Sequence, residues 1–167
     1  LEALPRVLAE YPNAKVMFAG TYQNVLGEEA YAQRLAPMLE RYRDRWIFMG
    51  NLNQRDLAAF YPNISVLVVP SLNSTEAFGL VQVEAMLSGT PSIASALPGV
   101  RQPVHQTGMG EVTPIGDSDA LAAAIIRVIR NRKDYIRPRA EIAARYNTER
   151  TAAEYEALFA ELGARNV

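Results

Sequence analysis

Short apolar runs alternate with helical patterns along most of the chain, and this alternation restricts the fold more than any other feature. The predicted strands are the apolar runs at residues 15–19, 46–49, 64–69, 92–96 and 111–113. The predicted helices have apolar residues at helical spacing and cover residues 27–42, 54–60, 80–88, 118–131, 139–145 and 148–162. Such alternation is typical of parallel strands joined by crossover helices. The sequence therefore predicts an α/β protein with a doubly wound parallel sheet.

Single polar residues mark where several of these helices begin. Asn53 and Asp117 precede predicted helices and Thr148 opens the last one, so each is a predicted N-cap whose side-chain oxygen accepts a backbone N–H. Residues 1–12 also have apolar side chains at helical spacing, and Pro5 suits an opening turn. They predict a further helix ahead of the first strand.

The length and composition indicate one soluble domain. The 167 residues are enough to bury a core, and no run of 18 apolar residues or basic leader with an apolar stretch is present. The formal charge is −1 with interspersed signs, which argues against a nucleic-acid partner. The chain has no cysteine, so it forms no disulfide or thiolate metal site, and we expect a cytoplasmic location.

One strand–loop–helix–strand unit carries most of the chemical information. The predicted strand 64–69 leads into a polar loop, Gly79 opens a helix, and residues 89–91 close it. The first N–H groups of a helix lack internal partners and lie at the positive end of its dipole, so they can bind phosphate oxygens. Because Gly79 has no Cβ, an anion can approach the amides of Phe78, Gly79 and Leu80 closely.

Two glutamates flank this helix start. A helical wheel places Leu80, Val83 and Leu87 on one arc with Glu84 at its edge, so we expect Glu84 to be half buried, about 8 Å along the axis from the start. A ribose attached to a diphosphate reaches that position, and a carboxylate suits its diol. Glu76 would face the far side of the diphosphate. At the carboxyl end of a strand, where open α/β sheets bind ligands, this arrangement predicts a nucleotide site.

Each glutamate also has a structural interpretation. Glu84 alone could pair with an arginine, and Glu76 alone could be an ordinary acidic residue at a helix start. The nucleotide-site prediction rests on the combination of loop, glycine, helix start and both acids in one unit.

The same residues resemble the donor-binding half of retaining glycosyltransferases with the GT-B fold, the large glycosyl transferases group 1 family. The signature of that family is two glutamates separated by seven residues, which here are Glu76 and Glu84. The resemblance implies that Glu76 is catalytic and lies near the transferred sugar, that Glu84 holds the ribose, and that the amides of Phe78 to Leu80 contact the diphosphate. It covers nearly the whole chain and is strongest in residues 70–71, 76–80, 84–86 and 89–91.

The resemblance implies transfer of a hexosyl group from a nucleoside-diphosphate sugar to a saccharide or lipid acceptor, with retention. No cofactor or metal is expected, so helix amides and basic side chains would balance the charge of the leaving diphosphate. Asp117 and Asp119 read as a helix start, and the sole His105 has no cysteine partner. The Gly108 to Gly110 pair reads as a turn before a strand.

The loop after the predicted strand 92–96 departs from the family pattern, which usually has a glycine pair followed by proline and glutamate. This chain has Pro98-Gly99-Val100-Arg101-Gln102 there. Gly99 fits a tight loop near the ligand. Arg101 could make bidentate contacts to the diphosphate, or it could be a solvated loop arginine.

A second departure is that the phosphate-binding arginine and lysine of the family, which precede its first helix, have no counterpart. The only lysines, Lys15 and Lys133, do not lie in a glycine-containing loop after a strand. We therefore expect residues 1–167 to be a fragment that lacks its first strand and the N-terminal acceptor-binding domain. Such a fragment should be inactive alone, and its unpaired strand edges favour self-association.

Several alternatives stay open at this point. The chain could belong to another GT-B enzyme, such as a sugar-nucleotide epimerase or an inverting transferase, or it could be a non-catalytic nucleotide-binding module. The basic segment 127–133 could be ordinary surface or could contact a membrane that holds lipid-linked acceptors. The apolar face of the last helix, formed by Tyr155, Leu158, Phe159 and Leu162, could pack across both halves of a complete enzyme.

Overall fold

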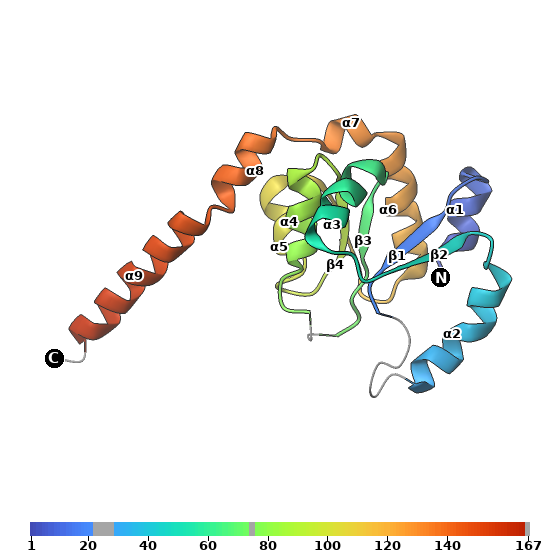
Figure 1. Ribbon diagram of the computed structural model, residues 1–167, viewed down its shortest axis with the longest axis horizontal. Helices are drawn as coiled ribbons and strands as arrows, with labels where there is room; N and C mark the ends of the chain where they lie inside the picture. The colour runs from blue at the N-terminus through green and yellow to red at the C-terminus, as the bar shows by residue number, and fades with distance from the viewer. Residues whose placement is uncertain (22–28, 74–75, 166–167) are drawn as a thin grey trace.

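Parallel pairing joins every strand in the described part of the chain. The computed structural model describes residues 1–21, 29–73 and 76–165 (Figure 1). Its strands are β1 (Val16–Ala19), β2 (Trp46–Gly50), β3 (Leu67–Val69), β4 (Ser92–Ser95) and β5 (Gly110–Thr113). Its helices are α1 (Leu4–Glu10), α2 (Glu29–Arg41), α3 (Gln54–Phe60), η1 (Tyr61–Asn63, a 3-10 helix), α4 (Leu80–Leu87), α5 (Gln102–Thr107), α6 (Ser118–Arg130), α7 (Arg132–Tyr135), α8 (Arg139–Arg145) and α9 (Thr148–Arg165).

The described strands form two sheets. One sheet pairs β1 with β2, and Val16 lies opposite Trp46. The other has the order β3-β4-β5, with Ser92 between Leu67 and Gly110. The predicted α/β class and parallel pairing are confirmed, although the strands do not form one continuous sheet over these residues.

A groove of about 1460 Å³ separates β1 from β3. Residues Val16 to Phe18 form one side and Val66 to Val68 the other, while α1, α2 and α6 contribute further apolar side chains. Among the described residues, β1 pairs only with β2 and β3 only with β4, so each has a free edge. This division of the sheet is the main difference from the predicted architecture.

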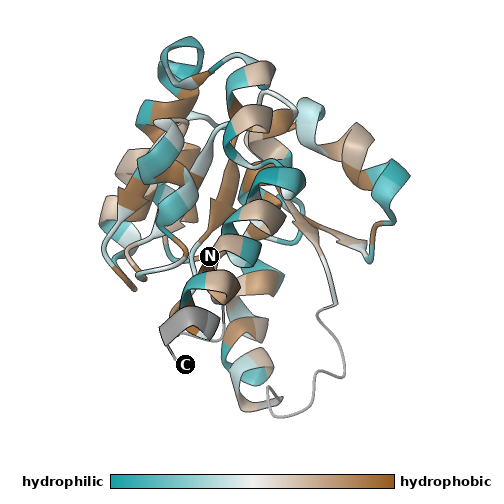
Figure 2. Ribbon diagram, turned by 90° about the vertical axis from the view of Figure 1, so that its left-hand side faces the viewer, coloured by the Kyte–Doolittle hydropathy of each residue, from teal (hydrophilic) through white to brown (hydrophobic). Residues whose placement is uncertain are grey.

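The core is built around β4, whose four residues are all buried. The largest cluster joins β3 and β4 to α4, α5 and α8, and its members are Val69, Val83, Met86, Ala94, Leu97, Val100, Val104, Met109 and Ile142. A smaller cluster packs Ala3 and Val7 of α1 against Ala122 of α6. Figure 2 shows the hydrophobic residues on the central strands and more polar residues along the outer helices. Helix α4 thus packs in the largest buried cluster of the molecule.

Most predicted elements are present with shifts of a few residues, and α3 and α8 have the predicted bounds. Residues 27 and 28, at the predicted start of α2, lie outside the described residues. The predicted caps of two helices are confirmed, because Asn53 accepts the Asp56 amide at 3.0 Å and Asp117 accepts the Ala120 amide at 2.8 Å. The predicted cap Thr148 is wrong, since the side chain of Asn147 accepts the Glu149 amide at 2.7 Å instead.

Three short helices, η1, α5 and α7, were not predicted. Helix α5 has six residues, contains Pro103, and is followed by Gly108, whose φ is +66°. A segment bounded by proline and glycine reads as a loop, and only its burial reveals a helix. Pro103, Val104 and Thr107 are buried, so tertiary packing stabilises this short turn.

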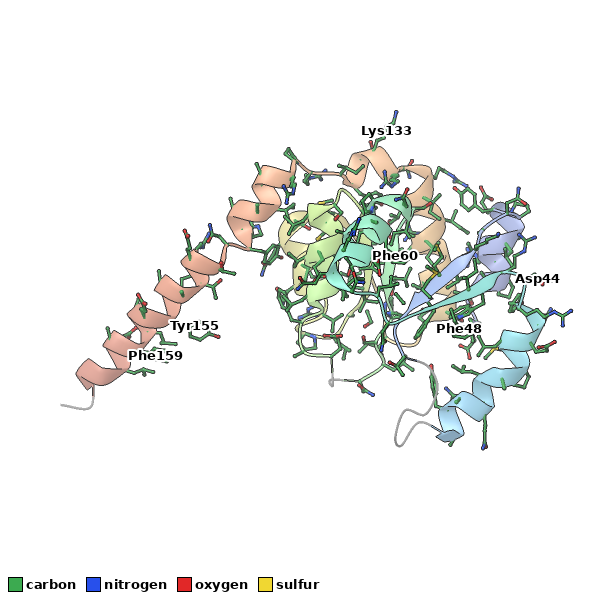
Figure 3. The ribbon with its side chains drawn as sticks, in the orientation of Figure 1. Asp44, Phe48, Phe60, Lys133, Tyr155 and Phe159 are labelled. Atoms are coloured by element: carbon green, nitrogen blue, oxygen red, sulfur yellow. The ribbon has the colours of Figure 1, made fainter. Side chains whose placement is uncertain are left out.

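Helix α9 extends away from the body of the molecule (Figure 1). Its predicted apolar face is exposed, and Phe159 is 65% exposed. The rings of Tyr155 and Phe159 lie 6.0 Å apart on this face (Figure 3). That this face packs across a second domain stays a prediction. No helix over the described residues is both long and apolar enough to cross a bilayer.

We expect the chain to self-associate through the groove, because free strand edges pair with other chains. Met17→Lys places a charge in the groove lining and should lower the association measured by sedimentation over a concentration series. Ile47→Lys is the matched control, since Ile47 lies opposite Met17 on β2 but outside the groove lining. A wild-type chain that stays monomeric at all concentrations would contradict the prediction.

Candidate functional site

The first residue before α4, Gly79, has a conformation that favours glycine. Its φ is +79°, and a Cβ there would lie 2.7 Å from the side-chain nitrogen of Gln82. The Gly79 amide donates a hydrogen bond of 2.9 Å to Oε1 of Glu76. The half-buried Glu76 therefore caps the helix start, which is the structural role that its position also suggested.

This hydrogen bond affects the amides of Phe78, Gly79 and Leu80, which are predicted to contact the diphosphate. The Gly79 amide is already bonded to a carboxylate, so a phosphate could use it only if Glu76 turned aside. The Phe78 ring packs against the core and makes an edge contact with Tyr146, with ring centroids 6.2 Å apart. The role of these amides in binding stays a prediction.

The buried face of α4 differs from the predicted one. Leu80 is 67% exposed and Glu84 is also exposed, so neither the expected burial of Leu80 nor the half-buried Glu84 is correct. The buried residues are Gln82, Val83, Ala85 and Met86. The wheel was built from the apolar residues alone, whereas the polar side chain of Gln82 is fully buried and hydrogen-bonded.

Gln82 connects α4 to two neighbouring elements. Its Nε2 donates to the carbonyl of Val100 at 2.8 Å, and its Oε1 accepts the Ser92 hydroxyl at 3.1 Å. The side chain is fully buried, so these bonds satisfy groups that would otherwise be costly to bury. Gln82 was missed at the sequence level, where the only signal was a polar residue between apolar neighbours in a helix.

Gly99 brings two predicted binding segments together. A Cβ at this position would lie 1.6 Å from the carbonyl oxygen of Ala77, so only glycine allows the two loops to meet. Arg101, two residues later, is the N-cap residue of α5 and is half exposed. No hydrogen bond or ion pair joins its guanidinium to another residue in the described ranges. Its predicted contact with a diphosphate is untested.

Glu84 has a tyrosine partner rather than the arginine considered from the sequence. The Tyr61 hydroxyl donates to Oε2 of Glu84 at 2.7 Å. Tyr61 lies in η1 and is 4% exposed, and its carbonyl accepts the Thr90 hydroxyl at 2.6 Å. Burial raises the pKa of Tyr61, and the bond to Glu84 raises it further, so the phenol keeps its proton. The sequence analysis did not identify Tyr61, whose only signal was its position between a helix and a strand.

The remaining predicted features lie elsewhere. His105 is exposed on α5, and neither Glu76 nor Glu84 lines the groove between β1 and β3. Three arginines of the basic segment 127–133 bind the protein's own groups, and the pairs are Arg127 with Glu111, Arg130 with Glu10, and Arg132 with the carbonyls of Ser65 and Gly89. These contacts use basic groups that the membrane interpretation would need.

Known structures share this fold. Sucrose-phosphate synthase from Thermosynechococcus elongatus superposes with a TM-score of 0.75 at 32% identity, over 98% of this chain and 42% of that one. Anabaena HepE, solved in complex with UDP, superposes with a TM-score of 0.77 at 23% identity, over 95% of this chain and 44% of that one. The fold is therefore the Rossmann-like half of a GT-B glycosyltransferase.

Sequence comparison defines the family. The family model Glycosyl transferases group 1 matches residues 1–147, so the chain belongs to that family, and the resemblance inferred from the two glutamates is confirmed. Phosphatidyl-myo-inositol mannosyltransferase of Mycobacterium leprae (strain TN) is 31% identical over 157 residues, 92% of this chain and 40% of the relative. D-inositol 3-phosphate glycosyltransferase of Mycobacterium marinum is 31% identical over 153 residues, 87% of this chain and 32% of the relative. The chain thus spans less than half of the relatives that it matches.

The contact between Gly99 and Ala77 predicts a clear cost for a single methyl group. Gly99→Ala should lower the free energy of unfolding by about 1–3 kcal/mol, because the added Cβ meets backbone atoms. Urea denaturation measures this difference. Gly163→Ala in α9 is the matched control, since its Cβ meets no atom within 4 Å and should be neutral or slightly stabilising. Equal stability of the two variants would contradict the close approach.

Proposed function

We propose that this chain is the sugar-nucleotide-binding half of a retaining glycosyltransferase that moves a hexosyl group to an acceptor. The observation that carries the proposal is the placement of the two glutamates around the start of α4, with Glu76 in the loop that leads from β3 to this helix and Glu84 within the helix. The carboxyl ends of strands are where open α/β sheets bind nucleotides. HepE has been solved with UDP and with UDP-glucose, and its fold supports the same class of ligand here.

The residues divide into two groups in this proposal. Glu84 accepts hydrogen bonds from the ribose hydroxyls, since its carboxylate is exposed and has acceptor capacity beyond the Tyr61 bond. The amides of Phe78 and Leu80 contact the diphosphate, and Arg101 adds positive charge from the facing loop. No metal is needed in this scheme, because amides and basic groups stabilise the leaving diphosphate.

Glu76 has two successive roles in this proposal. Without donor it caps α4 through the Gly79 amide. When a diphosphate takes that amide, the carboxylate is displaced toward the transferred sugar, where it stabilises the positive charge that develops at the anomeric carbon. The exchange replaces one anionic acceptor by another at the same helix end, so the amide stays paired.

We also propose that a complete protein supplies one further strand and an acceptor-binding domain. The groove between β1 and β3 has a free strand edge on each side, and α1 precedes β1 in the position of a crossover helix. A strand in this groove would join the two sheets into one. The acceptor, a saccharide or a lipid, would bind on the second domain, so the 167 residues alone should not turn over substrate.

Substitution of the ribose-binding residue tests the proposal. Glu84→Gln in the intact protein should weaken nucleotide binding by about tenfold or more, because a hydrogen bond to a charged group is lost. Calorimetry with UDP, GDP and ADP measures the effect and identifies the base. Glu154→Gln on α9, which removes a carboxylate paired with Arg150, is the matched control and should bind like wild type. A wild-type protein that binds none of the three nucleotides would overturn the proposal.

A further inference from the structure

Tyr61 is fixed in the protein at several points. Its ring is buried beside Phe60, with ring centroids 5.9 Å apart. Its carbonyl accepts the Thr90 hydroxyl, and Thr90 itself is fully buried. Because both the ring and the backbone are held, the phenol oxygen has little freedom to move. Its one described side-chain partner is the carboxylate of Glu84.

Glu84 is held much less firmly by its own surroundings. Its side chain is exposed on α4, and an exposed glutamate samples many rotamers at little cost. The 2.7 Å bond from Tyr61 to Oε2 restricts those rotamers, and no residue of the described ranges donates to Oε1. The bond therefore selects one orientation of the carboxylate and leaves acceptor capacity on both oxygens.

We infer that Tyr61 is a positioning residue that orients the Glu84 carboxylate for the ribose diol of the nucleotide. This inference rests on the proposed function. A carboxylate that is already oriented loses less rotamer freedom when the ribose binds, so the contact contributes more to affinity. It also increases selectivity for ribose, because a 2′-deoxyribose leaves part of the oriented acceptor without its donor.

The choice of tyrosine fits this role. A phenol donates one proton in a direction set by its rigid ring, whereas a lysine would hold the carboxylate by charge alone. A neutral donor also leaves the negative charge of Glu84 available to a second donor, such as a ribose hydroxyl. A phenol is protonated at neutral pH, so the donor is present there, and burial raises the Tyr61 pKa further above its ordinary value.

The test compares ribose selectivity rather than affinity alone. Calorimetry of the intact protein gives dissociation constants for UDP and 2′-deoxy-UDP. If GDP or ADP binds more tightly than UDP, that nucleotide and its 2′-deoxy form are used instead. Wild type should prefer the ribonucleotide. In Tyr61→Phe this preference should fall at least about threefold, with binding of the deoxynucleotide changed by less than about twofold.

Tyr135→Phe is the matched control. Tyr135 also donates to a carboxylate, Oε1 of Glu111, at 2.6 Å, and no described contact joins this pair to Tyr61 or Glu84. Loss of the Tyr135 hydroxyl should leave the ratio of the dissociation constants of the ribonucleotide and the deoxynucleotide unchanged. Thermal denaturation of both variants shows whether each is folded at the temperature of the titrations.

The possible results separate the inference from the proposed function. If Tyr61→Phe weakens both nucleotides equally, Tyr61 has only a structural role and the inference is wrong. If Glu84→Gln abolishes the ribose preference but Tyr61→Phe keeps it, the proposed function stands and the inference fails. If wild type binds no nucleotide, the proposed function fails first. A loss of preference in both Glu84→Gln and Tyr61→Phe, but not in Tyr135→Phe, supports the inference.

Discussion

The buried side-chain amide of Gln82 determines where α4 lies, and the candidate site depends on it. By bonding to Ser92 on β4 and to the carbonyl of Val100, it fixes the helix to the sheet and to the loop ahead of α5. The same loop contributes Gly99, which touches the carbonyl of Ala77 at the approach to α4. Removing one partner of such a buried network leaves the others unsatisfied. The position of the helix start is therefore fixed by the buried contacts of Gln82 and Gly99.

The sequence was informative at several positions where a local rule determines structure, although the local rule chose Thr148 instead of Asn147 as the cap of α9. Helix α3, its cap Asn53 and the cap Asp117 follow from residues a few positions apart, and the family followed from the spacing of Glu76 and Glu84. Prediction from the sequence failed where tertiary contacts determine which residues are buried and which side chains meet. Only the packed structure shows which face of α4 is buried, and only it shows that Tyr61 and Glu84 meet across 23 positions.

The helix start also shows why one residue can have two interpretations that are both physically sound. The Gly79 amide needs an acceptor, and Glu76 provides one. A phosphate satisfies the same requirement with more charge and more oxygens. A residue that caps a helix is thus well suited to leave it when an anion arrives, because the amide remains paired throughout. In the proposed function, the Glu76 carboxylate and a phosphate of the donor occupy this acceptor position in turn.

The division of the sheet implies an uneven distribution of local stability. A two-stranded sheet is marginal by itself, and β1 and β2 pair only with each other among the described strands. By contrast, β4 is buried along its whole length between two neighbours. Backbone amides of β1 and β2 should therefore exchange with solvent through small local openings, whereas those of β4 require global unfolding. The candidate site is attached to the part of the molecule that opens last.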